Sequence, residues 1–137
     1  MAVAIGLVLL GACNPTTPAP LPSGATQLQL LTQAPPGINI GPGGCPTALM
    51  SPVRVQRSGD VLSFVDATTG ERRRLSWPAG FSARVLDGRA ELITPLGNVY
   101  AREGDVLSNL IGGAGDNADM LVCFASSDEY ENGPPSP

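Results

Sequence analysis

Residues 82–94 read SARVLDGRAELIT, and this stretch decides the fold. Apolar and polar side chains alternate over residues 82–86 and again over 89–94, with Asp87-Gly88 between the two runs. A two-residue connection between strands favours a type I′ turn, which needs positive φ at both positions, and Asp-Gly suits both. The stretch therefore predicts a β-hairpin.

Short alternating runs separated by turn residues continue on both sides of this hairpin. The other expected strands are centred on Val53–Gln56, Leu62–Phe64, Arg72–Trp77, Val99–Ala101, Val106–Leu107 and Met120–Phe124. Residues 112–115 are predicted to form a glycine-rich loop before the last strand, and the 14 Pro and 17 Gly of the chain disfavour long helices. We predict an all-β fold: a small antiparallel barrel of five or six strands, OB-like or SH3-like, because closure removes exposed strand edges.

The N-terminus carries an apolar run, AVAIGLVLL over residues 2–10, followed by Gly11-Ala12-Cys13. The run is too short to span a bilayer, which takes about 20 residues, and is typical of a signal peptide over residues 1–12. Leu10-Gly11-Ala12-Cys13 resembles the lipobox of bacterial lipoproteins. The resemblance implies cleavage before Cys13, acylation of its thiol and a location in the bacterial envelope, lipid-anchored on the extracytoplasmic side of a membrane. An ordinary secretory signal with a chance Cys is the alternative.

The chain after Cys13 divides by composition into three parts. Residues 13–44 are rich in Pro and Gly, and no charged residue precedes Arg54, so we expect a tether that spans up to about 90 Å when stretched. Within it, residues 27–33 could pair as a short strand or helix before Pro35-Pro36. Residues 45–125 are predicted to be the β-domain, and residues 126–137 a disordered acidic tail.

Cysteine count predicts a disulfide. The chain has three Cys, and lipid on Cys13 leaves Cys45 and Cys123 as an even pair in an oxidising compartment. A bridge between them would close most of the domain and stabilise it by about 4.5 kcal/mol in the chain-entropy model. Two buried free thiols, or a metal site, are the alternatives, and two Cys without His fall short of a zinc site.

Several motifs of the domain resemble a small β-domain that recurs in bacterial secreted proteins and lipoproteins of uncharacterised function. They are Trp77-Pro78-Ala79-Gly80-Phe81, then the stretch GNVYAREGD over residues 97–105, then Gly112-Gly113, bracketed by Cys45 and Cys123. The resemblance covers residues 45–124 and implies a fold, but it supplies no chemistry.

Missing residue types exclude several functions. The chain has no His, which excludes Ser-His-Asp and Cys-His catalysis within it, and all eight basic residues are Arg. The net charge of −4 argues against a nucleic-acid partner, because phosphate binding needs a basic surface. We expect a protein without a cofactor or metal that is not an enzyme.

Two groups of side chains are candidate binding surfaces. Trp77 and Phe81 could form an aromatic platform for a sugar or peptide, or instead fill the core. Arg72-Arg73-Arg74, with Arg54 and Arg57 on neighbouring strands, could form a basic stripe for anionic lipid or wall polymer. The alternative for the arginines is a solvated edge that discourages aggregation. Asp116-Asn117-Ala118-Asp119 offers oxygen ligands for calcium, although a polar turn explains it equally.

These observations predict a lipid-anchored envelope protein whose β-domain is a non-catalytic interaction or structural module. Its partners would be the membrane, through the anchor, and an envelope protein or cell-wall polymer. The alternative is a ligand-binding or weakly hydrolytic protein acting on cell-wall glycans, for which Trp77, Phe81 and scattered carboxylates are the motivation.

Overall fold

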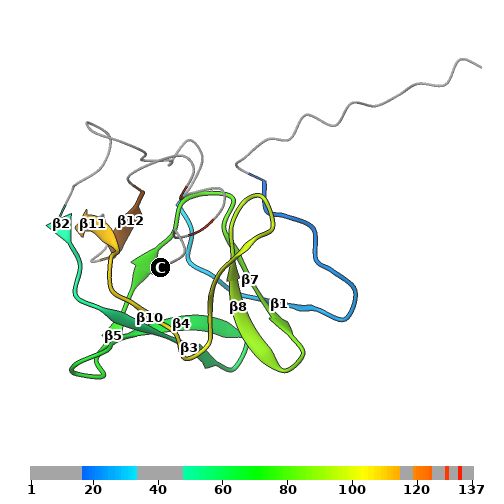
Figure 1. The fold of residues 1–137 in the computed structure, drawn as a ribbon, viewed down its shortest axis with the longest axis horizontal. Coiled ribbons are helices and arrows are strands. Elements are labelled where there is room, and N and C mark those ends of the chain that lie inside the picture. The colour runs from blue at the N-terminus through cyan, green and yellow to red at the C-terminus, as the bar shows by residue number, and fades with distance from the viewer. Residues whose placement is uncertain (1–16, 34–47, 115–118, 125–128, 130–132, 134–137) are drawn as a thin grey trace, which may run out of the picture.

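A computed structural model of the chain describes residues 17–33, 48–114, 119–124, 129 and 133 (Figure 1). Every element whose bounds are described is a β-strand, and the strands form three four-stranded sheets. The all-β prediction is therefore confirmed. None of the three strand orders closes into a ring among these residues, so the five- or six-stranded barrel stays a prediction.

The first sheet contains the predicted hairpin. Its order is β1 (Thr26–Leu28), β7 (Ser82–Leu86), β8 (Arg89–Ile93) and β9 (Val99–Arg102), all antiparallel. Asp87 and Gly88 have φ of 50° and 77°, the positive values that a type I′ turn requires. The hairpin formed by β7 and β8 is confirmed at the predicted residues.

The second sheet has the order β10 (Val106–Leu107), β3 (Val53–Ser58), β4 (Val61–Asp66) and β5 (Arg72–Arg73). The third has the order β2 (Ala48–Leu49), β11 (Ile111–Ala114), β12 (Met120–Cys123) and β6 (Leu75–Ser76). Its β12–β6 pair is parallel, and the other pairs in both sheets are antiparallel.

The predicted strand over residues 72–77 is divided between two sheets. Arg73 pairs with Phe64 of β4 in the second sheet, whereas Leu75 pairs with Met120 of β12 in the third. Alternation of side chains is the same in one strand as in two consecutive short ones, so the sequence pattern does not reveal where a chain changes sheets.

The predicted glycine-rich loop is wrong over residues 112–114, which belong to β11. Gly112 pairs with Val122, and a Cβ placed on Gly112 would lie 1.9 Å from the carbonyl oxygen of Leu121. Glycine is therefore required in this strand because the backbone of β12 approaches too closely for any side chain.

Residues 26–33, assigned to the tether from their composition, are part of the folded domain. Thr26–Leu28 form β1, Gln29 makes a parallel bridge to Val61 of the second sheet, and Thr32 makes a parallel bridge to Trp77, which follows β6. One short segment thus contacts all three sheets. The tether prediction for residues 13–44 is wrong over this segment, because its backbone groups find partners in strands that are distant in sequence.

The predicted disordered tail also makes contacts with the domain at its two described residues. Glu129 accepts a side-chain hydrogen bond from Tyr100 of β9, and Gly133 is buried against Val99 and Tyr100. The remaining residues of 126–137 lie outside the described part of the chain.

The core is an aromatic cluster where the three sheets meet. Trp77 is fully buried at its centre, with ring centroids 5.4–6.4 Å from those of Phe64, Phe81, Tyr100 and Phe124. Phe81 and Phe124 are stacked, with ring planes 11° apart. Because five of the chain's few aromatic rings cluster together, the domain has a core despite its low aromatic content.

Candidate functional site

A groove opens beside β4, where the edge of this strand changes partner. At its start, Gln29 donates its backbone N–H to Asp60 O (2.8 Å), and Leu62 donates to Gln29 O (3.0 Å). Pairing with β5 begins at Phe64. Between these contacts lies a groove of about 490 Å³, a volume in the range of small-molecule sites.

The walls of this groove combine apolar side chains with arginines. Leu30, Leu31 and Leu62 line one part of it, and Arg72, Arg73 and Arg74 line another, so we call it the arginine groove. The arginines were predicted from the sequence, but the leucines were not, because Leu30 and Leu31 precede Arg72 by more than 40 positions. No local pattern links them.

The three arginines of the groove have different partners. Arg73 Nη2 lies 3.0 Å from Asp66 Oδ2, and Arg74 Nε forms an ion pair with Asp119. The side chain of Arg72 is exposed and has no ion-pair or hydrogen-bond partner among the described residues. The charges of Arg73 and Arg74 are thus balanced by carboxylates, and the charge of Arg72 is available to a ligand.

Asp66 holds the end of β4 and orients Arg73. Its carboxylate accepts hydrogen bonds from the backbone N–H groups of Thr69 (3.0 Å) and Thr68 (2.9 Å), and from Arg73. These donors, Thr69 first and then Arg73, lower the pKa of Asp66 to about 2 because they stabilise the charged form. Asp66 therefore stays ionised, and Arg73 stays paired, at any ordinary pH.

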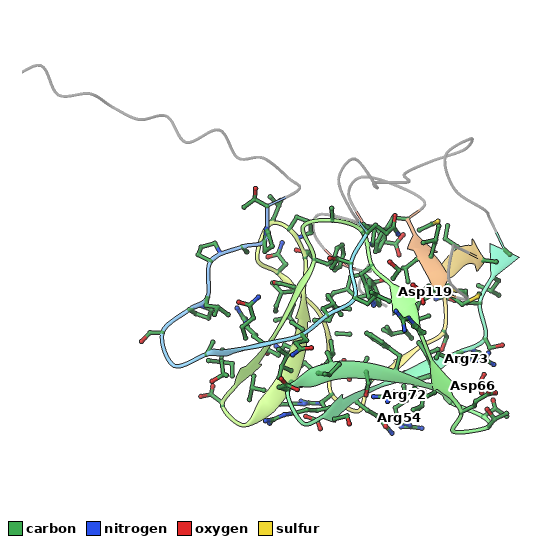
Figure 2. All side chains as sticks on the ribbon, turned by 180° about the vertical axis from the view of Figure 1, so that it is seen from behind. Arg54, Asp66, Arg72, Arg73 and Asp119 are labelled. Carbon is green, nitrogen blue, oxygen red and sulfur yellow. The ribbon has the colours of Figure 1, made fainter. Side chains whose placement is uncertain are left out.

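The broader basic stripe is present in part. Arg54 and Arg72 flank Val65 on neighbouring strands, with both residues exposed on the second sheet (Figure 2). Arg57 bonds the carbonyl oxygen of Gly59 through its Nε at 2.9 Å instead. The structure therefore brings Arg54 to the side of Arg72, and Arg57 is engaged in its own turn.

The aromatic-platform interpretation of Trp77 and Phe81 is wrong. Trp77 is 0% exposed and Phe81 is 2% exposed, so neither ring presents a face to a ligand. The alternative, that both fill the core, is confirmed. The indole Nε1 of Trp77 has no hydrogen-bond partner among the described residues, and the ring packs against four other aromatic rings.

The remaining predicted positions divide between described and undescribed parts of the chain. Cys123 is buried at the end of β12, whereas Cys13 and Cys45 lie outside the described residues. Asp119, offered as a calcium ligand, instead pairs with Arg74, and residues 116–118 are not described. The described residues include no helix long and apolar enough to cross a membrane.

Comparison of the chain with protein-family models, with curated proteins and with solved structures found no match. The resemblances to the lipobox and to the small β-domain therefore stay predictions.

Proposed function

We propose that this chain is a lipid-anchored protein of the bacterial envelope whose β-domain is a non-catalytic module, binding an anionic envelope partner in the arginine groove. The observation that carries the proposal is Arg72, an exposed guanidinium with no carboxylate partner among the described residues, in a groove partly lined by leucines. A guanidinium presents five donors in a planar fork that matches phosphate and carboxylate oxygens.

The groove favours binding over catalysis. Its described lining contains no carboxylate, so it lacks the paired acids that cleavage of a glycosidic bond requires. Burial of Trp77 also removes the observation that motivated the glycan-hydrolysing alternative. A cell-wall polymer that carries phosphate or carboxylate groups fits the charge of Arg72.

The lipid anchor and the disulfide are parts of the same proposal. Ile111 pairs with Leu49 on one side and Cys123 on the other, so the last two lie about 10 Å apart, two strand spacings. Cys45 precedes Leu49 by four residues, which reach up to about 14 Å. A disulfide needs a Cα separation of about 5–6 Å, and this reach allows it.

We also keep the small antiparallel barrel of five or six strands, OB-like or SH3-like, as a proposal for the fold. It is supported by three sheets that surround one aromatic cluster and by the Gln29 and Thr32 bridges that connect them. An experimental structure in which the sheets diverge without enclosing the cluster would exclude it.

Titration calorimetry with poly(glycerol phosphate) as probe tests the groove. We expect binding that weakens with added salt and that falls about tenfold or more in an Arg72→Gln variant, because a charge-assisted hydrogen bond contributes about 1.5–3 kcal/mol. Arg89→Gln is the matched control, since Arg89 is an exposed arginine on β8 outside the groove. Equal affinity for both variants would refute the groove.

The intact mass of protein from native membranes, alkylated before and after reduction, tests the anchor and the disulfide. We expect a chain that begins at Cys13 with added acyl mass, and two thiols that react only after reduction. An unacylated chain would refute the lipid anchor, and two thiols that react without reduction would refute the disulfide.

A further inference from the structure

The chain that follows Cys13 contacts the domain within a few residues, at the turn between β8 and β9. A Cβ placed on Gly97, in the turn between β8 and β9, would lie 3.5 Å from the Cβ of Ala19, so Ala19 lies against this turn. Figures 1 and 2 both show the start of the described chain beside the β8–β9 turn. Cys13 precedes Thr17 by four residues, which span at most about 14 Å. A lipid on Cys13 therefore holds this end of the domain close to the bilayer.

Two exposed leucines stand at this same end. Leu96 is 54% exposed in the β8–β9 turn, and Leu21 is 46% exposed two residues after Ala19. Residues 17–25 and 94–98 contain no charged side chain. Turns usually carry polar residues or glycine, so two exposed leucines on neighbouring uncharged segments make this end of the domain apolar.

The β8–β9 turn holds Leu96 in a fixed place. Gly97 donates its backbone N–H to Thr94 O (2.9 Å), and Asn98 donates to the hydroxyl oxygen of Thr94 (3.2 Å). Pro95 fixes the backbone before Leu96, and the φ of 90° at Gly97 reverses the chain after it. The turn therefore holds Leu96 in an exposed position, and burying Leu96 against another surface would cost little backbone conformational entropy.

We infer that the end formed by residues 17–22 and 94–98 docks on the bilayer that carries the anchor, with Leu96 and Leu21 inserted among the lipid headgroups. The inference rests on the proposed lipid anchor. It replaces a long flexible tether with a domain seated on the membrane. Arg54 and Arg72 lie on the side of the molecule away from the start of the described chain (Figure 2).

Quenching of tryptophan fluorescence by brominated lipid tests the docking in the full-length acylated protein. The protein is reconstituted in vesicles of phosphatidylethanolamine and phosphatidylglycerol that contain a phospholipid brominated on its acyl chains. A Leu96→Trp variant reports on the docked end, and Val106→Trp is the matched control, since Val106 is 43% exposed on β10 in the second sheet. Native Trp77 is buried and supplies a constant background.

We expect Leu96→Trp to lose roughly half of its added emission, because interfacial side chains lie about 5–10 Å deep at the headgroup boundary. Val106→Trp should lose little, and the difference should persist in high salt because the contact is apolar. An acylated protein with equal quenching at both positions would overturn the docking and leave the anchor intact. A chain without acyl mass, measured on the same sample, would overturn the anchor and the docking together.

Discussion

Gly112 offers the sharpest test of the fold, because a single methyl group added there meets backbone. A Cβ at this position would lie 1.9 Å from the carbonyl oxygen of Leu121 and 3.3 Å from Cε of Met50. Rotating a side chain can relieve the second contact but not the first. In a Gly112→Ala variant, β12 must therefore move away from β11 by more than about 1 Å to reach an ordinary separation.

The expected loss of stability follows from that movement. Separating β11 from β12 forfeits ladder hydrogen bonds worth about 1 kcal/mol each, and overpacking a well-filled site adds about 1–3 kcal/mol. Together we expect Gly112→Ala to lower the free energy of unfolding by about 3–5 kcal/mol. Small domains are stable by only about 5–15 kcal/mol, so the variant should unfold at a clearly lower urea concentration than the native protein.

Urea unfolding followed by the fluorescence of Trp77, the single tryptophan, measures this change. Gly59→Ala is the control: Gly59 has φ of 60° and nothing within 4 Å of an added Cβ, so only the strain of the left-handed backbone applies. That strain is about 1–2 kcal/mol. If Gly112→Ala unfolds at the same urea concentration as Gly59→Ala, the close approach of β11 and β12 is refuted.

Three further changes test the core, a buried ion pair and the acid response. In urea melts followed by circular dichroism, Trp77→Ala should destabilise by about 3–5 kcal/mol and Trp77→Phe by clearly less, because the indole N–H has no hydrogen bond to lose among the described residues; equal losses would contradict this. Glu91, 8% exposed in its side chain, lies between Arg84 (2.8 Å) and Arg102 (3.2 Å). Glu91→Ala should therefore cost about 3 kcal/mol in urea melts, because it leaves the partly buried Arg84 unpaired, whereas Arg102→Ala should cost under about 1 kcal/mol. The pKa of Asp66 is lowered to about 2 in the folded protein from an ordinary 3.8, so its stabilisation is complete above about pH 5 and is lost progressively as the pH falls through the folded pKa. Acid titration of the melting temperature should show this loss in the native protein and a smaller one in Asp66→Asn.

Local signals predicted the elements that depend on neighbouring residues. The β7–β8 hairpin was predictable because Asp87-Gly88 fixes the turn and alternation fixes the register on each side. The β3–β4 hairpin was predictable for the same reason, with a turn at Gly59. In both cases the strands are adjacent in sequence, so the information lies within a dozen residues.

Pairing between distant segments was not predictable, because nothing in a strand's own sequence names its partner. Arg74 marks the point where the chain leaves the second sheet for the third, yet the alternation continues through it unchanged. Gly112 was assigned to a loop because glycine usually weakens strands, and the close approach of Leu121 that requires it is a tertiary contact. A glycine inside an otherwise apolar run is the one signal that could have indicated the approach.

The sequence predicted the arginines of the candidate site but not the carboxylates that pair with two of them. Three consecutive arginines were visible in the sequence, but only the structure distinguishes Arg72 from Arg73 and Arg74. The distinction depends on Asp66, the last residue of β4, and on Asp119, which directly precedes β12; these carboxylates pair with Arg73 and Arg74. Counting charges along a chain overestimates a basic surface whenever carboxylates from other strands neutralise it.

Residues 26–33 show how composition can conceal a structural role. Residues 26–33 lack charge and precede two prolines, as a tether does, yet they supply a strand edge to the first sheet and backbone bonds to the other two. Polar side chains such as Gln29 and Gln33 remain at the surface or bond other backbone, so the segment never needed a long apolar pattern. Residues 26–33 are therefore part of what joins the three sheets, although their composition is that of a tether. In a chain that is anchored at Cys13, the position of the domain over the membrane is then set by the same residues that join its sheets.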